Sequence, residues 1–154
     1  HGDSSRMYNV GDISIKANNL CKVTHDCLME SIDEIKVGEP ISLIGKKIED
    51  IVTSNNFSVV RDFCGHGVGL KFHENPSILH YYDSEYDNIK FIDGMIFTIE
   101  PMINAGKYQS KILSDGWTAV TKDKTLSAQY EHTIYINGDN VEILTESPNK
   151  AFYN

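Results

Sequence analysis

The spacing of apolar residues changes once along this chain, near residue 56, and that change limits the folds it can adopt. Before it, apolar residues recur at helical intervals in two segments. Ser14 can cap the first segment, which we predict to run to about Val37 and to end at Gly38. We predict that the second helix starts after Pro40 and ends near residues 54–56, where Ser-Asn-Asn breaks the pattern.

Beyond residue 56 the apolar residues instead form short runs that are typical of strands. We predict strands at 57–64, 95–103, 127–136 and 141–144, and a short one at 7–10 before a turn at Gly11-Asp12. Two helices followed by a series of strands predict an α+β domain, with the helices packed on one face of a curved antiparallel sheet. We expect a single domain over residues 1–154, with a loose tail at 146–154.

Charge and composition exclude several classes of protein. The 154 residues suffice for one core, and their net charge of −8 argues against nucleic-acid binding. No apolar run approaches the roughly 20 residues that a membrane-spanning helix needs, so we expect no membrane partner. Three irregularly spaced cysteines suit a reducing compartment. We therefore expect a cytoplasmic protein, or an organellar one if a transit segment precedes this sequence.

The stretch CGHGVGLKFHENP, residues 64–76, holds two histidines, and glycines flank the first. Glycines inside a strand mark a bend or a place of close approach. His66 and His73 are seven residues apart, so on a regular strand they would face opposite sides. If both face one cleft, the chain needs a bend or bulge between them, which Gly67 or Gly69 can supply.

Glu100 ends the run MIFTIEP, which is apolar except for Thr98 and is expected to be a largely buried strand. Pro101 favours an extended backbone at Glu100. A carboxylate in that position is costly unless a positive group meets it. The run alone leaves two readings open: Glu100 meets a cation, or it lies at the surface where the strand leaves the core.

Glu131 lies in SAQYEHTIYI, where alternate residues face opposite sides of the expected strand. Gln129, Glu131 and Thr133 share the more polar face, which fits either a strand beside a wet cleft or one that faces solvent. His132 falls on the apolar face, and we interpret it as a core histidine rather than a ligand.

Several other residues have structural readings. His25 lies in a helix, Asp62 suggests a local turn or pairing with its neighbour, and Asp3 carries no chemistry by itself. Cys64 and His66 lack a third group that would orient a thiol mechanism. His66 with several carboxylates is instead a ligand set for divalent ions such as Mn, Fe, Co or Zn.

Four sequence blocks follow HGDSSRMY in order: CGHGVGLKFHENP, MIFTIEPM, DGWTAVTKD and SAQYEHT. In this order they resemble the type I methionine aminopeptidases, over a stretch from His1 to about Thr145. Each block is a modest signal, but all of them together are specific. The resemblance implies the pita-bread fold and the metal-dependent removal of the N-terminal methionine from nascent proteins and peptides.

The resemblance also implies two divalent metal ions, drawn from Co, Mn, Fe and Zn. The ligands that it places in this sequence are Asp3, His66, Glu100 and Glu131. In the family pattern Asp3 and Glu131 bridge the two ions, and His66 and Glu100 hold one of them.

The same resemblance assigns substrate-contacting and catalytic residues. Glu100 would move a proton, and His73 would contact the substrate near the scissile amide. Phe72, Cys64 and Trp117 would line the pocket for the methionine side chain. The implied partners are a peptide or nascent chain with methionine first and, in the cell, the ribosome.

The family pattern has a further metal-binding aspartate upstream of Asp3, which this sequence does not contain. We therefore expect the chain to be the C-terminal part of the catalytic domain, to need an upstream segment of the same protein and to be inactive alone. The alternative is a binding module on the same fold that has lost catalysis. The intact contexts of His66, Glu100 and Glu131 favour the enzyme.

Overall fold

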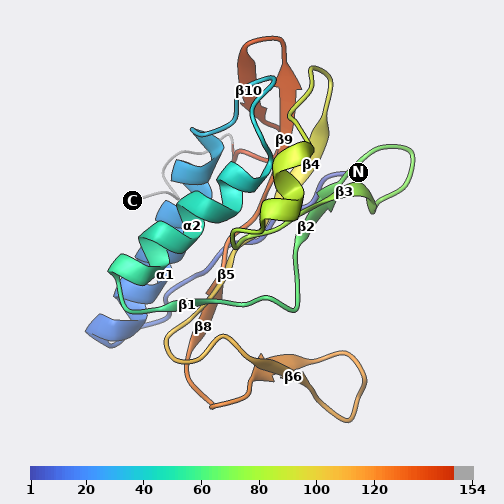
Figure 1. Ribbon diagram of the computed structural model, residues 1–154. Coiled ribbons are helices and arrows are strands. Elements are labelled where there is room, and N and C mark those ends of the chain that lie inside the picture. The colour runs from blue at the N-terminus through green and yellow to red at the C-terminus, as the bar shows by residue number, and fades with distance from the viewer. Residues whose placement is uncertain (148–154) are drawn as a thin grey trace.

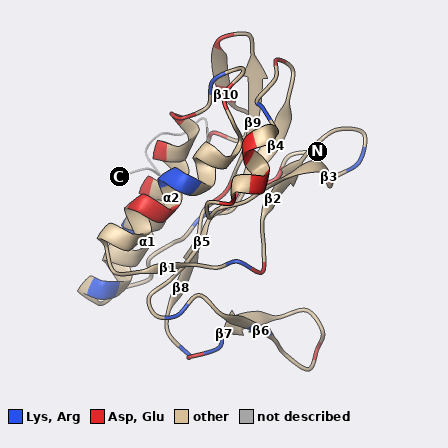
Figure 2. Cartoon of the chain, in the orientation of Figure 1, with Lys and Arg blue, Asp and Glu red and all other residues tan. Residues whose placement is uncertain are grey.

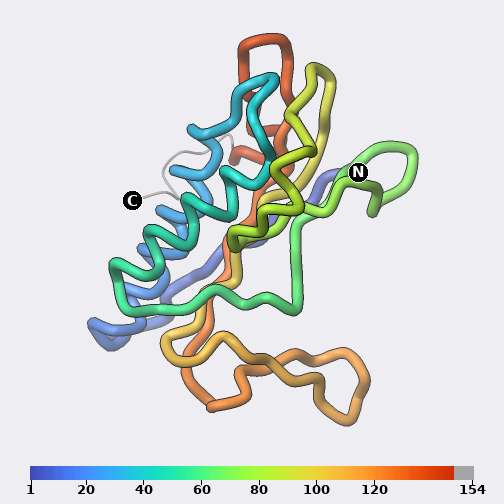
Figure 3. The backbone as a smooth tube through the Cα atoms, viewed as in Figure 1, coloured from blue at the N-terminus to red at the C-terminus, as the bar shows by residue number. Residues whose placement is uncertain are grey.

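The computed structural model describes residues 1–147, in which two helices pack against antiparallel sheets (Figure 1). Helix α1 covers Ile15–Ile32 and helix α2 covers Ser42–Ser54. Ser14 caps α1, because its hydroxyl accepts a hydrogen bond from Ala17 N at 3.2 Å. The two helices lie side by side on one side of the sheets (Figure 3). The predicted α+β arrangement is confirmed.

Helix α1 ends earlier than predicted, at Ile32 rather than near Val37. From Asp33 the chain turns into a loop that buries Ile35. At the end of this loop Gly38 N donates a hydrogen bond to Phe91 O at 2.9 Å. Tertiary burial and this long-range hydrogen bond therefore override the helical periodicity of the last five residues.

The strands form three sheets within residues 1–147, and every pairing is antiparallel. The five-stranded sheet has the order β10-β9-β4-β2-β3, the three-stranded sheet has the order β1-β5-β8, and β6 and β7 form a separate hairpin. The strand bounds are β1 Ser58–Val59, β2 Gly65–Gly67, β3 Glu74–Ile78, β4 Ile96–Ile99, β5 Met102–Asn104, β6 Ser110–Ile112, β7 Ala119–Thr121, β8 Ser127–Gln129, β9 His132–Asn137 and β10 Asn140–Ile143. A 3₁₀ helix, η1, covers Ser84–Asn88.

The long strands predicted at 95–103 and 127–136 are wrong in one respect, because each is split in two. The first becomes β4 and β5, and the second becomes β8 and β9. The breaks fall at Glu100-Pro101 and at Tyr130-Glu131, where the chain passes between the five-stranded and the three-stranded sheet.

The pairing register continues across these breaks. Ile99 pairs with His132 on one side of the break, and Met102 pairs with Gln129 on the other. In the unbroken register Glu100 therefore lies opposite Glu131. The two glutamates occupy the kink of a single bent ladder that connects the two sheets.

The other predicted strands have mixed outcomes. Of the run 57–64, only Ser58–Val59 forms a strand, β1. Residues 7–10 form no strand, although the bend at Gly11-Asp12 is present. The prediction at 141–144 is confirmed as β10. Of the predicted tail, residues 148–154 lie outside the described part of the chain.

The core lies between the helices and the two larger sheets. Its fully buried members come from both helices, from β3, β4, β5 and β9, and from the segments that precede α2 and β4. They include Leu20, Leu28, Ile44, Ile48, Phe91, Phe97, Ile99, Ile103, Ile134 and Ile136. Their burial holds β4 and β9 in place, and the ends of these strands carry Glu100 and Glu131.

The sequence has 22 Asp and Glu residues against 14 Lys and Arg residues, and both kinds are spread over the helices and loops (Figure 2). Among the described residues no helix combines the length and the apolar character that crossing a membrane requires.

Candidate metal centre

Four predicted ligands that are far apart in the sequence converge in space, and we call them the carboxylate cluster: Asp3, His66, Glu100 and Glu131. His66 Nε2 lies 3.5 Å from Asp3 Oδ2 and 3.8 Å from Glu100 Oε1. Ligand atoms of Asp3, His66 and Glu131 all lie within 4.8 Å of one another. The predicted convergence is confirmed.

Three strands and the N-terminal segment position the carboxylate cluster. His66 is the middle residue of β2, which lies beside β4 in the sheet. Glu100 directly follows β4, and Glu131 directly precedes β9. The N-terminal segment reaches the same place because Ser5 and Glu131 exchange backbone hydrogen bonds, with Glu131 N to Ser5 O at 3.0 Å. The strands meet at the centre of Figure 1, near the N-terminus.

The cluster is poor in positive charge for its number of carboxylates. Burial, together with the neighbouring carboxylates of Glu100 and Asp3, raises the pKa of Glu131 to about 8. Burial also raises the pKa of Glu100, although a hydrogen bond from Thr98 and the nearby His66 act in the opposite direction. Like charges directly opposite each other across a strand pair are destabilising, so this kink favours a bound cation.

His66 presents the correct nitrogen for a metal ligand. Its Nδ1 lies 3.0 Å from the backbone oxygen of Gly67, which can only accept a hydrogen bond. Nδ1 therefore carries a proton, and Nε2, the nitrogen that faces the carboxylates of Asp3 and Glu100, is the one placed to bind a metal. One imidazole and three carboxylates suit a hard or borderline divalent ion, so the donor set fits the metal that the sequence predicts.

Both histidines of the glycine-rich stretch face the same side. The ring centroids of His66 and His73 are 4.2 Å apart, and Phe72 lies 4.5 Å from His73 and 5.5 Å from His66. The pairing of β2 with β3 shifts register between His66 and Gly67, which confirms the predicted bulge. A cleft of about 490 Å³ opens here, lined by His66, His73, Lys71, Glu74, Asn75 and Ser77.

The glycines of β2 have a reason that the sequence analysis did not foresee. The sequence indicated a bend or a close approach at these glycines without showing which group approaches them. A Cβ at Gly65 would lie 2.3 Å from Thr98 O, and one at Gly67 would lie 2.4 Å from Asn75 O. These glycines therefore let neighbouring strands pack closely on both sides of His66.

Two further predicted site residues, Cys64 and Trp117, differ in how far they are buried. Cys64 directly precedes β2 and is half-buried. Trp117 lies in the turn of the β6–β7 hairpin and is 88% exposed, so it is no part of the core. The roles of Cys64, Phe72 and Trp117 in a side-chain pocket stay predictions.

The structural readings of His25 and His132 are supported by their contacts, and that of Asp62 is supported in part. His25 makes an edge contact with Tyr130, at 5.2 Å between centroids. His132 is buried, and its Nδ1 lies 2.9 Å from Thr145 Oγ1. Residues 61 and 62 form a bend, as expected, but the Asp62 carboxylate accepts hydrogen bonds from Ser110 on β6, and Arg61 pairs with Glu49 instead.

Two residues that contact Glu100 were not predicted from the sequence. Thr98 donates a hydrogen bond to Glu100 Oε1 at 2.9 Å, and His80 Nε2 accepts one from Glu100 N at 3.1 Å. Burial lowers the pKa of His80 to about 3, so its ring is neutral. Thr98 had a visible signal, since it is the lone polar residue of an apolar run and lies two positions before Glu100. His80 had none.

Comparisons with known proteins identify the family to which this chain belongs. The profile of metallopeptidase family M24 matches residues 1–138, and the chain belongs to this family. Within it, the chain is 47% identical over 150 residues to a methionine aminopeptidase of Buchnera aphidicola subsp. Schizaphis graminum, covering 97% of this chain and 57% of the relative. It is 48% identical to the methionine aminopeptidase of Escherichia coli K12 over 94% of this chain and 54% of the relative. The chain thus spans a little over half the length of these curated relatives.

Solved structures agree with this assignment. The methionine aminopeptidase of Rickettsia prowazekii superimposes with a TM-score of 0.89 at 47% identity, covering 94% of this chain and 58% of that one. The Thermotoga maritima enzyme gives a TM-score of 0.90 at 38% identity, over 95% and 58%. Prolidase from Pyrococcus furiosus, at 23% identity and a TM-score of 0.70, shares the fold. The expected pita-bread fold is confirmed.

Proposed function

We propose that this chain supports the metal-dependent removal of N-terminal methionine from peptides and nascent proteins. The observation that carries the proposal is the convergence of His66 with three carboxylates at the kink between two sheets. The similarity to methionine aminopeptidases over most of the chain supports the same substrate class.

We assign Asp3, His66, Glu100 and Glu131 as ligands for divalent ions from the group Co, Mn, Fe and Zn. The carboxylates of Asp3, Glu100 and Glu131 and the Nε2 of His66 would hold these ions. When bound, these ions would supply Lewis acidity, which polarises a carbonyl and makes water a stronger acid.

Glu100 is also the candidate for proton transfer. Its Oε1 accepts the hydrogen bond from Thr98 at 2.9 Å, so Oε2 is the oxygen that we assign to the moving proton. Burial raises the pKa of Glu100, which brings it closer to neutral pH, where a carboxyl can both accept and return a proton. Glu100 would take a proton from the attacking water and deliver it to the leaving amine.

His73 and its neighbours are assigned to the substrate. His73 is exposed beside His66, and its ring could donate a hydrogen bond to the scissile amide as charge develops there. Phe72, Cys64 and Trp117 are assigned to the methionine side chain. The natural substrate would be a nascent chain at the ribosome, and we place the reaction in the cytoplasm.

A peptide-hydrolysis assay tests the proposal, with the native protein as the cell produces it. We expect hydrolysis of Met-Ala-Ser to stop after chelation, to return with Mn²⁺ or Co²⁺, and to be lost in Glu131→Gln. Glu49→Gln is the matched control, because Glu49 lies on α2, outside the carboxylate cluster, and forms an ion pair with Arg61 at 3.2 Å. Hydrolysis that survives both chelation and Glu131→Gln would contradict the proposal. Metal binding without hydrolysis would favour a binding module.

A further inference from the structure

Two buried threonines lie directly behind the carboxylate cluster. Thr98 on β4 and Thr133 on β9 are cross-strand partners, and both are 0% exposed. Glu100 lies two residues after Thr98, and Glu131 lies two residues before Thr133. Because the strands are antiparallel, both threonines and both glutamates project from the same face, with the threonines one step deeper.

The hydroxyl of Thr98 connects two members of the cluster. It accepts a hydrogen bond from His66 N at 3.0 Å and donates one to Glu100 Oε1 at 2.9 Å. Its direction is unambiguous, since a backbone N–H can only donate, and a hydroxyl has a single proton. Thr98 therefore links the backbone position of His66 to the side-chain position of Glu100.

The hydroxyl of Thr133 holds a third member in a similar way. It accepts a hydrogen bond from Asp3 N at 2.9 Å and donates one to Asp3 O at 2.8 Å. The backbone N–H and C=O of Asp3 are thus both hydrogen-bonded to the Thr133 side chain. The backbone N–H of Thr133 is itself bonded to Thr145 Oγ1 at 3.1 Å, which ties this residue to the segment after β10.

We infer that Thr98 and Thr133 are positioning residues of the metal centre, an inference that rests on the proposed function. A buried position in a strand would ordinarily accept valine, which has the same shape and no polar group to satisfy. Here each hydroxyl both donates and accepts a hydrogen bond, and its partners are residues that present ligand atoms. The paired threonines therefore fix Asp3, His66 and Glu100 relative to one residue pair of the β4–β9 ladder. Outer contacts of this kind orient metal ligands.

Mn²⁺ titration of the full chain by calorimetry tests the inference. We expect Thr98→Val and Thr133→Val each to weaken Mn²⁺ binding by roughly 10- to 100-fold, the range found for outer contacts of metal sites. Thr98→Ser and Thr133→Ser retain the hydroxyl and should bind within a few-fold of the parent chain. The visible absorption of bound Co²⁺ should change in the valine variants and be restored in the serine variants, which general loss of stability would not produce.

Thr24→Val is the matched control. Thr24 is also 0% exposed, but its hydroxyl donates to Leu20 O within α1 at 2.7 Å. This variant should bind Mn²⁺ like the parent. If a valine variant fails to fold, Thr→Ala and Thr→Ser at the same position form a pair that differs by the hydroxyl alone. Equal Mn²⁺ affinity across that pair, or in Thr98→Val, Thr133→Val and Thr24→Val, would overturn the inference. A parent chain that binds no Mn²⁺ would instead count against the proposed function.

Discussion

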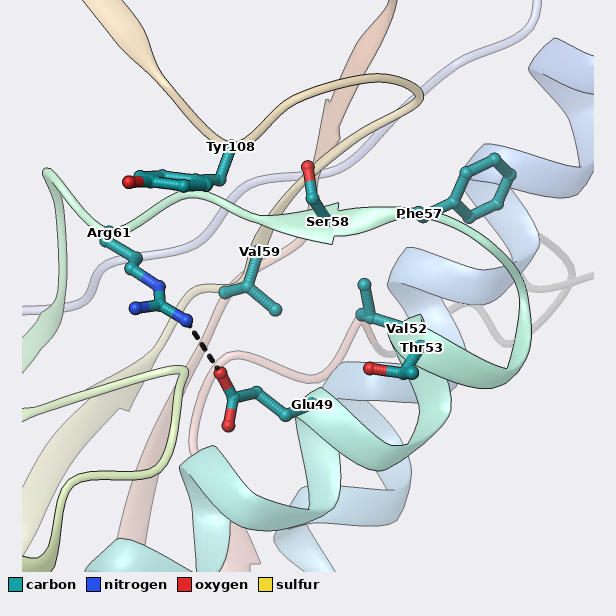
Figure 4. Close-up of a pocket in the computed structure, with 8 residues that line it drawn as sticks. All are labelled: Glu49, Val52, Thr53, Phe57, Ser58, Val59, Arg61 and Tyr108. Atoms are coloured by element: carbon teal, nitrogen blue, oxygen red, sulfur yellow. Dashed lines mark hydrogen bonds and ion pairs between the residues drawn. The ribbon is translucent and has the colours of Figure 1, made fainter.

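Two partly buried regions of this molecule contain glutamates. The regions differ in how far the chain itself supplies positively charged and hydrogen-bonding partners for the carboxylates. At the pocket formed by Arg61 and its neighbours, of about 150 Å³, Glu49 Oε1 accepts a hydrogen bond from Arg61 at 3.2 Å (Figure 4). Its Oε2 accepts another from Tyr82 N at 3.1 Å. The Arg61 guanidinium also lies over the rings of Tyr81 and Tyr108, at 5.0 and 5.2 Å. Every charged group drawn there has a partner from the chain itself.

The carboxylate cluster lacks that balance. Glu131 is 5% exposed, and its burial together with the nearby carboxylates of Glu100 and Asp3 raises its pKa to about 8. The comparison shows that burial by itself does not mark a metal site, since Glu49 is also partly buried. What distinguishes the cluster is an unmet demand for positive charge among side chains whose backbones are firmly held.

The largest expected effect is on stabilisation by metal. Mn²⁺ at 100 times its Kd should stabilise the parent chain by about 2.7 kcal/mol. Glu131→Gln removes a negative charge from the cluster and should abolish this gain, whereas Glu49→Gln should leave it intact. Thermal unfolding with and without Mn²⁺ measures both. A similar loss in the two variants would mean that the regions do not differ in the way we describe.

The metal-free chain should lose stability as pH rises. The folded pKa of Glu131, about 8, lies above its ordinary value of 4.5, so the folded state holds a proton that the unfolded state releases. Stability therefore falls between about pH 4.5 and pH 8, by at most about 1.4 kcal/mol per pH unit for one proton. Denaturant titrations across this range should show a slope that Glu131→Gln reduces. An unchanged slope in that variant would contradict the raised pKa.

His80 should produce the opposite slope on the acid side. Its folded pKa, about 3, lies below its ordinary value of 6.5, so the unfolded state takes up a proton that the folded state refuses. Stability that is present above pH 6.5 is thus lost as pH falls toward 3. His80→Gln keeps an acceptor for Glu100 N and should flatten the decline in denaturant titrations below pH 6.5. Equal declines in parent and variant would assign the acid loss to other groups.

Much of the fold followed from local patterns in the sequence. The helices at Ile15–Ile32 and Ser42–Ser54 were predictable because their periodicity and the cap at Ser14 are local signals. The breaks at Glu100-Pro101 and Tyr130-Glu131 were not, because a strand-like pattern of residues suits one long strand as well as two shorter strands in different sheets. Pro101 restricted the backbone at Glu100 but could not show that the chain changes sheets there.

The carboxylate cluster was predictable by resemblance to a family, and its supporting contacts were not. Thr133 was read as part of a polar face beside a wet cleft or solvent, yet it is 0% exposed. The Asp3 backbone covers it, and a contact between residues 3 and 133 leaves no periodic trace in the sequence. His80 was missed for the same reason, because only the tertiary fold brings it to Glu100 N.

The smallest expected effect belongs to the Arg61 pocket. Arg61 and Glu49 are 51% and 32% exposed in their side chains, and exposed ion pairs contribute about 0.2–1 kcal/mol. Two exposed cation–π contacts add about 0.5–1 kcal/mol each. Arg61→Ala should therefore lower the free energy of unfolding by about 1–3 kcal/mol. Arg61→Lys should lower it by less, because lysine retains the charge but loses the planar group above Tyr81 and Tyr108. Denaturant unfolding gives these values, and Mn²⁺ titration of the same variants should match the parent. If Arg61→Ala weakened Mn²⁺ binding as strongly as Glu131→Gln, the two regions would be coupled, and the carboxylate cluster could no longer be treated as independent of the pocket.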